Sequence, residues 1–174
     1  MEYSELIEFH GHSCPGLASG YRMSLAAMEF LGVSRSGDEE LVAIIENDAC
    51  GVDALQYISG CTFGKGNLLF RDYGKSVYTL YSRTSGRGVR VLFHGRGVPD
   101  GLREDKPAYI RFLRECPDEA ILTLTPVENE PPKPARIRAS AACQICHEPV
   151  METRLRDNAG KAICIPCAQR QIQD

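Results

Sequence analysis

The segment FHGHSCPG, residues 9–16, places three side chains that bind metals at alternate positions: His10, His12 and Cys14. In an extended chain, alternate side chains point to the same side. The spacing therefore predicts three ligands that face one point, and imidazole together with thiolate suits zinc and other transition metals. A simpler interpretation is that His12 or Ser13 only caps the helix that follows.

Two further segments carry side chains of the same kind. NDACGVDA contains Cys50 and Asp53, and GCTFGKGN contains Cys61 and Lys65. A cysteine at a helix N-terminus has a lowered thiol pKa, so Cys14 and Cys50 are expected to be reactive or to bind a metal. Taken singly, each cysteine could instead be a small buried apolar residue. The candidate catalytic residues are Cys14, Cys50, Asp53 and Lys65, and the candidate second metal site is His10, His12, Cys14, Cys50 and Cys61.

The segment GCTFGKG is not a phosphate-binding P-loop. That motif has four residues between its first glycine and Gly-Lys, and Ser or Thr after the lysine. Here there are three, and Gly66 follows Lys65. Lys65 is therefore expected only to supply a positive charge. Cys116, at the end of an amphipathic segment, is expected to be structural, and His94 is given no role.

The C-terminal cysteines form a stronger pattern. Cys143-x2-Cys146 and Cys164-x2-Cys167 are separated by 17 residues. Each pair places two thiolates on one ion, and four thiolates close a tetrahedral zinc site that supplies the folding energy of a small module. Two redox pairs are the alternative. His147 is expected to be an exposed neighbour rather than a ligand.

The zinc module has basic side chains that would suit contacts with phosphates. Modules of this type serve equally often as protein-contact or structural elements, so nucleic acid is a possible partner but not the favoured one. These residues are Arg136, Arg138, Arg154, Arg156, Lys161 and Arg170.

Composition sets the broad class of the protein. The chain has 174 residues, 43% hydrophobic and 25% charged, with a net charge of −3, which is ordinary for a soluble globular protein and gives no strong attraction to nucleic acid. The N-terminus resembles no export signal and no segment is apolar enough to span a membrane. We therefore expect a cytoplasmic protein, whose eight cysteines are metal ligands or free thiols rather than disulfides.

Hydrophobic periodicity predicts an α+β fold, with helices packed on a sheet rich in antiparallel strands. In the helix at 15–32, a stripe of Leu17, Tyr21, Leu25 and Met28 should face the core. Residues 76–83 and 88–94 should form a β-hairpin. The other expected helices are 3–9, 50–60 and 105–116, and the other expected strands are 41–46, 120–128 and one that begins at 67.

The composition changes near residue 128. ENEPPKPARIRAS suits a stiff, exposed linker. The expected organisation is an α+β core domain over 1–127, a Pro-rich linker over 128–141, and a four-cysteine zinc ribbon or treble clef over 142–174.

Three motifs together resemble the E-subunit family of formylmethanofuran dehydrogenase: FHGHSCPGLASGYRM, ENDACGVDALQYISGCTFGKGNLLFRDYGK and the C-terminal cysteine pairs. The resemblance covers roughly residues 5–125 and the zinc module that many members append. It implies an α+β core, often in an intertwined dimer, and a zinc finger of ribbon or treble-clef type. The family's characteristic positions correspond to His10, His12, Cys14, Cys50, Asp53, Cys61, Gly64, Lys65 and Gly66.

The family is named for its association with a molybdenum or tungsten enzyme that fixes carbon dioxide onto methanofuran, a reaction of methanogenesis. This chain lacks the length for a molybdopterin domain, so we do not expect it to be the catalytic subunit. The resemblance implies a metal-handling accessory protein that could work with partner subunits.

Three hypotheses follow. In the first, the protein binds a structural zinc ion in the C-terminal module and a second transition metal in the core. In the second, Cys14 or Cys50 is the nucleophile of a thiol enzyme, with His10 or His12 as base, oriented by Asp53, and Lys65 stabilising developing negative charge. In the third, the zinc module is an adaptor for nucleic acid or a partner protein.

Overall fold

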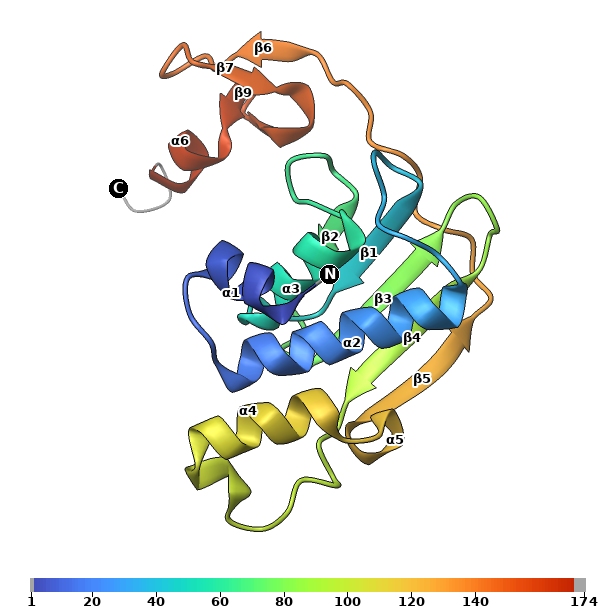
Figure 1. Cartoon of the computed structure of the whole chain (residues 1–174). Coiled ribbons are helices and arrows are strands. Elements are labelled where there is room, and N and C mark those ends of the chain that lie inside the picture. Colours follow the sequence, from blue (N-terminus) through green and yellow to red (C-terminus); the bar gives the residue numbers. More distant parts are fainter. Residues whose placement is uncertain (1, 171–174) are drawn as a thin grey trace. The chain divides into compact units, whose positions relative to one another are not determined.

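The computed structural model describes residues 2–170, and the chain divides into two compact units (Figure 1). The first unit runs to Ala135 and the second begins at Arg136. The boundary lies within the Pro-rich segment. Each unit has its own buried core, so each is described by itself.

The first unit contains a five-stranded sheet and its helices. The sequence predicts most of these elements to within a few residues. In chain order they are α1 (Tyr3–His10), α2 (Pro15–Leu31), β1 (Leu41–Ile45), α3 (Gly51–Ser59), β2 (Leu68–Phe70), β3 (Val77–Ser82), β4 (Gly88–Phe93), a 3-10 turn (Leu102–Glu104), α4 (Lys106–Glu115), α5 (Asp118–Ile121) and β5 (Leu122–Val127).

The strand order in the sheet is β2-β1-β3-β4-β5. Strands β1 and β2 are parallel, with Ala43 opposite Leu68, and α3 makes the crossover that a parallel pair requires. All other neighbours are antiparallel, and β3 and β4 form the expected hairpin. The fold is therefore α+β with a mixed, mostly antiparallel sheet, as predicted.

Helix α2 lies across one face of the sheet, with α4 beside it (Figure 1). Leu17 and Met28 are buried as expected, whereas Tyr21 and Leu25 are only partly buried. The small residues Ala18, Gly20, Ala26 and Ala27 are buried as well. Because α2 contacts the sheet, α3 and α4 together, it is buried on more of its circumference than a single stripe predicts.

The last strand starts later than the sequence suggests. Residues Asp118–Ile121 form a helical turn, and β5 begins at Leu122 instead of residue 120. Pro117 precedes this turn, and the acidic residues Asp118 and Glu119 stand in it, where the helix dipole favours negative charge.

The Pro-rich segment is only partly a free linker. The Arg83 guanidinium donates to the Pro132 carbonyl, and the Ala135 N–H donates to the Glu39 carboxylate at 3.0 Å. At its other end, Ser140–Ala142 forms strand β6 of the second unit. Both ends of the predicted linker are therefore held by hydrogen bonds to one unit or the other.

The second unit consists of two short hairpins and a helix. Its core is made by three of the module's cysteines and Ile163, which is fully buried. Strand β6 pairs with β7 (Pro149–Met151), and β8 (Leu155–Asn158) pairs with β9 (Lys161–Cys164), both antiparallel. The remaining elements are a 3-10 turn (Glu152–Arg154) and helix α6 (Ile165–Arg170).

Candidate metal centre

Four side chains of the first unit converge on one point. One ligand atom from each of His10, His12, Cys14 and Cys50 lies within 4.8 Å of the ligand atoms of the other three. The rings of His10 and His12 also contact each other, with centroids 4.6 Å apart. The first three come from one segment, and Cys50 comes from a distant part of the chain.

A helix end and a turn bring the first three together, not the extended backbone expected from the sequence. His10 is the last residue of α1, and Gly11 closes that helix in the left-handed conformation, with φ of 94°. Glycine adopts this conformation at no steric cost. Cys14 then caps α2, where its Sγ accepts a hydrogen bond from the Leu17 N–H at 3.3 Å.

Cys50 reaches the group because α2 and α3 pack very closely. A Cβ atom added at Gly20 would overlap the backbone of Gly51, and one added at Gly16 would lie 3.3 Å from the Cys50 Cβ. Only glycine permits this approach, so the N-terminal ends of the two helices meet. The glycines of SGYRM and ACGVD are thus part of the site, although nothing in their local sequence predicts that role.

His10 is held by a carboxylate. Its Nδ1 lies 2.7 Å from the Asp53 Oδ2. Because a carboxylate only accepts hydrogen bonds, Nδ1 carries a proton, and in the neutral ring Nε2 keeps its lone pair. Among the described residues, His10 Nε2 is the one buried side-chain nitrogen or oxygen without a hydrogen-bond partner. A carboxylate behind a histidine is also the usual support of a metal-binding imidazole.

The pKa of Cys50 departs from the sequence-based expectation. Burial raises the pKa of the Cys50 thiol, and the neighbouring Cys14 raises it further. The Cys50 side chain makes no capping hydrogen bond with the first turn of α3 that would oppose this rise in its pKa. Two thiols in contact resist joint ionisation unless a cation lies between them.

Two candidates lie away from this group. Cys61 follows the C-terminal end of α3, about 14 Å of helix from Cys50, is fully buried, and has its pKa raised by burial. Lys65 donates to the Asp38 carbonyl at 3.0 Å. The structure therefore brings neither Cys61 nor Lys65 to the four-residue group: Cys61 packs in the apolar core, and Lys65 lies against another loop.

In the second unit, the sulfur atoms of Cys143, Cys146, Cys164 and Cys167 lie within 4.8 Å of one another. Backbone N–H groups of Ile145 and Cys164 donate to the Cys143 Sγ. This cluster fits a zinc ribbon. His147 lies outside it, with a positive φ of 62°.

The thiols of this cluster have divergent pKa values. Backbone N–H donors, that of Cys164 foremost, lower the pKa of Cys143 to about 6. Hydrogen bonding with the Cys164 side chain, burial and the other thiols raise the pKa of Cys167 to about 12. Thiols crowded in this way share negative charge poorly, and a bound cation relieves that repulsion.

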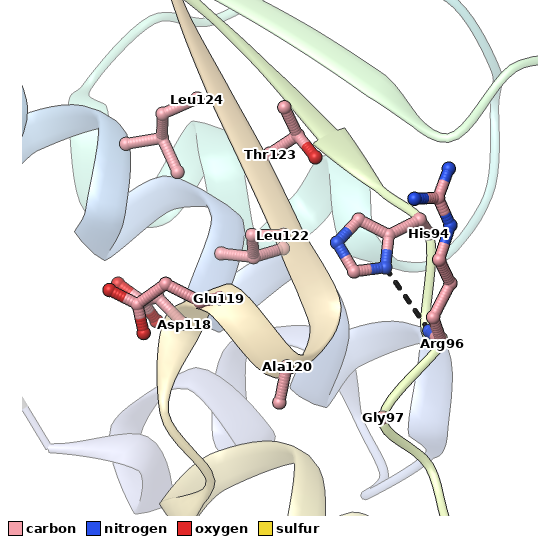
Figure 2. A pocket seen from close by; sticks show the side chains of 9 residues that line it. All are labelled: His94, Arg96, Gly97, Asp118, Glu119, Ala120, Leu122, Thr123 and Leu124. Atoms are coloured by element: carbon pink, nitrogen blue, oxygen red, sulfur yellow. Dashed lines mark hydrogen bonds between the residues drawn. The ribbon is translucent and has the colours of Figure 1, made fainter.

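Another hollow in the surface lies elsewhere on the first unit, between the His94 loop and β5 (Figure 2). Its volume is about 820 Å³. Two of its polar groups are already used by the protein: His94 Nδ1 accepts the Arg96 N–H at 3.1 Å, and Asp118 is paired with Arg22. The described residues that line it form no group of metal ligands, so it does not compete with the His/Cys group as a chemical site.

Two protein families match this chain. The family described as FmdE, molybdenum formylmethanofuran dehydrogenase operon, matches residues 9–123, and the prokaryotic dksA/traR C4-type zinc finger matches residues 136–173. The first match contains the whole His/Cys group, and the second contains the four-cysteine cluster. No helix of the described residues is long and apolar enough to cross a membrane.

The chain is similar to two further proteins, and the first of them is described as FmdE-like. The crystal structure of a tungsten formylmethanofuran dehydrogenase FmdE-like protein from Syntrophus aciditrophicus is 28% identical, with a TM-score of 0.73 over 95% of this chain and 90% of that chain. A probable S-adenosyl-L-methionine-binding protein of Archaeoglobus fulgidus is 33% identical over 92% of this chain. The chain spans about half the length of that relative. Because the FmdE match covers more than half of its residues, the chain belongs to the FmdE family and carries a C4 zinc-finger unit at its C-terminal end.

Proposed function

We propose that this FmdE-related, metal-binding protein holds two ions, one in each unit. The C-terminal four-cysteine cluster would hold zinc as a structural ion. The core group of two imidazoles and two thiolates would hold a second transition ion, for which zinc is the simplest choice.

The observation that carries the second ion is the buried, unpartnered Nε2 of His10. A buried polar atom without a partner is costly. The bond to Asp53 fixes the His10 ring, and ligand atoms of three further residues lie within 4.8 Å of a His10 ring nitrogen. A cation is the partner that satisfies all four at once.

The spacing of the four ligand atoms agrees with tetrahedral coordination of one ion. Zinc–sulfur and zinc–nitrogen bond lengths place the ligand atoms of a tetrahedron about 3.4 to 3.8 Å apart. All four ligand atoms already lie within 4.8 Å of one another, so small side-chain movements would close the centre. Four protein ligands give a closed centre, which favours a structural or metal-handling role. His12 is the exposed ligand, and its displacement would open a position for chemistry.

Metal content per chain tests this proposal. Plasma mass spectrometry of the purified protein should find two metal ions per wild-type chain. His12→Ala/Cys14→Ser should lose one ion, and Cys143→Ser/Cys146→Ser should lose the other. One ion per wild-type chain, lost only from the second variant, would contradict a core metal.

A thiol enzyme is the second candidate function. It is favoured by the Asp53–His10 pair, which has the arrangement of a carboxylate that orients a base beside a thiol. The raised pKa of Cys50 speaks against that thiol as the nucleophile. Rapid alkylation of Cys14 in wild-type protein without prior chelation would support the enzyme, whereas a bound ion should protect both thiols.

The name of the Archaeoglobus relative suggests a ligand. Beside His10 and Cys50 lies a hollow of about 380 Å³, with the rings of Phe63 and Phe70 and the carboxylates of Asp48 and Asp53 in its wall. No lysine or arginine is among the described residues that line it. Aromatic faces and carboxylates suit a sulfonium cation. S-adenosylmethionine should therefore bind more tightly than S-adenosylhomocysteine, which lacks the sulfonium charge, in calorimetry, and equal or absent binding would exclude this ligand.

We also expect a homodimer working as an accessory protein, with partner subunits where they occur. Several large apolar side chains of the first unit are exposed and would suit an interface: Phe9, Phe63, Phe70 and Tyr73. None of the eight cysteines is in a disulfide. Thiolate ligands require such reduced cysteines, which favours a reducing compartment such as the cytoplasm.

A further inference from the structure

A third, smaller cavity lies beside the contact of α2 and α3 and is lined by residues of these helices, of strands β3 and β4, and of α4. Its volume is about 180 Å³, the share of about six water molecules in the liquid. The described residues that line it include no acidic or basic side chain. The polar residues in its wall are Ser19, Asn47, Ser76, Tyr78 and Tyr109.

Tyr78 gives this cavity its chemical character. The residue as a whole is only 3% exposed, but its hydroxyl oxygen is not a fully buried atom, and it has no hydrogen-bond partner within the described part of the chain. That oxygen lies 2.5 Å from the place where a Cβ on Gly51 would stand, so it points to the start of α3. Burial raises the Tyr78 pKa, with Asp53 and Cys50 adding to the effect, so the hydroxyl stays protonated and is a hydrogen-bond donor.

The first turns of two helices line the same space. Gly16 and Gly51 stand in the first turns of α2 and α3, where backbone N–H groups have no partner within their helix. Two helix N-termini therefore meet at the cavity wall, and both favour negative charge. Ser19 and Asn47 already use their side chains within the protein, since Ser19 donates to the Gly16 carbonyl and Asn47 donates to that of Lys75.

We propose that this cavity binds a small carboxylate, whose oxygens accept hydrogen bonds from the Tyr78 hydroxyl and from the N–H groups at the starts of α2 and α3. Several donors with no charged side chain among the described lining residues match a group that only accepts. The apolar part of the wall, with Met23 and Phe93, fits a short hydrocarbon tail.

The carboxylate site adjoins the metal group but does not depend on it. Gly16 belongs to the cavity wall, and a Cβ added there would lie 3.3 Å from the Cys50 Cβ and 3.9 Å from the sulfurs of Cys14 and Cys50. An occupant would thus lie behind the two thiolates, whereas the S-adenosylmethionine hollow opens beside His10.

Binding of acetate and propionate to the intact chain tests the proposal, by calorimetry and by the thermal shift that each acid produces. Both acids should bind wild-type protein. Acetamide, the uncharged analogue of acetate, should bind more weakly. Tyr78→Phe should lower the affinity for acetate about tenfold or more, because it removes one hydrogen bond to a charged group. Because the lost hydroxyl has no partner among the described residues, this variant should fold as well as wild type. Tyr81→Phe is the matched control, since Tyr81 is a buried tyrosine of the same strand that belongs to another cluster.

Two outcomes would overturn the carboxylate site. One is the absence of acetate binding to both metal-free and zinc-loaded protein. The other is acetate binding that requires the core ion and is unchanged in Tyr78→Phe, because acetate would then be a metal ligand. Metal content is measured separately, so either outcome leaves the two-ion proposal standing.

Discussion

At the scale of single residues, the core site depends on one histidine whose two nitrogens face different partners. Asp53 accepts from Nδ1 of His10, which leaves the buried Nε2 as the nitrogen available to bind an ion together with His12 and the two cysteines. The side chain of His10 is 10% exposed, against 41% for Asp53. The carboxylate therefore fixes the ring from the solvent side and leaves the lone pair turned inward.

Removing the charge of Asp53 should weaken the core ion without unfolding the protein. A carboxylate behind a histidine ligand typically contributes 10- to 100-fold in metal affinity. We expect Asp53→Asn to lower the affinity of the core centre by that factor, measured by competition with a chromophoric chelator. Asp48→Asn is the control, because Asp48 is exposed in the same wall. Equal metal affinities in the two variants would show that Asp53 does not support the core metal centre.

Glu40 gives a prediction for pH. The Ser36 hydroxyl donates to its carboxylate at 2.5 Å and the Asp38 N–H donates at 2.9 Å, which lowers the Glu40 pKa from 4.5 to about 2. A lowered pKa stabilises the fold above pH 4.5, and this stabilisation is lost as the pH falls towards 2. Glu40→Gln should thus be less stable than wild type in denaturant melts at neutral pH, and the gap should close in acid. A difference in stability between wild type and Glu40→Gln that stays constant with pH would contradict this role of the Glu40 carboxylate.

At the scale of elements, the site is a consequence of how closely α2 and α3 pack. Each helix supplies one thiol at its N-terminal end, and the glycine pair Gly20 and Gly51 lets the two ends meet. The same contact forms the wall between the metal group and the small cavity. A larger side chain at this contact should therefore disturb both the metal group and the small cavity.

Gly20→Ala should separate the two helices. Overpacking of a tight contact costs about 1 to 3 kcal/mol. We expect that loss in the free energy of unfolding, together with loss of the core ion but not of the ion in the four-cysteine cluster. Gly64→Ala is the control, because no described atom lies within 4 Å of a Cβ at that position. Retention of both ions by Gly20→Ala would show that the site tolerates a wider spacing.

At the scale of the whole molecule, the two units are stabilised in different ways. The first unit has a large apolar core. The core of the second unit consists of three cysteines and Ile163. So small a core does not stabilise a fold by itself, and a metal ion must supply the difference.

Chelation should therefore unfold the two units unequally. With excess EDTA, we expect amide hydrogen exchange to reach the unfolded rate across β6–β9, since those strands lose the ion that holds them together. Strands β1, β3 and β4 should remain protected, because their side chains are buried in the first unit's core. Protection of β8 and β9 that survives complete metal removal would mean that the second unit folds without zinc.

Much of the fold follows from local patterns. The periodicity of α2 and the alternation in β3 and β4 predict those elements closely, and the Cys-x2-Cys pairs predict the second unit's cluster. The turn at Asp118–Ile121 escapes prediction because four residues are too few to show a period. Similarly, Tyr78 gives no local signal of its exceptional position, since a tyrosine in a strand is common.

The sequence by itself determines which residues are able to bind metal, since imidazole and thiolate chemistry belongs to the side chains and Cys-x2-Cys spacing is a property of the chain. Only the tertiary structure decides which of them meet. His10 joins His12 and Cys14 through the left-handed turn at Gly11, and Cys50 joins them through the packing of α2 on α3. Cys61, at the far end of the same helix, does not. Helix α3 itself separates Cys50 from Cys61, as its predicted span already implies, whereas the packing of α2 on α3 that brings Cys50 to Cys14 is encoded in no local pattern.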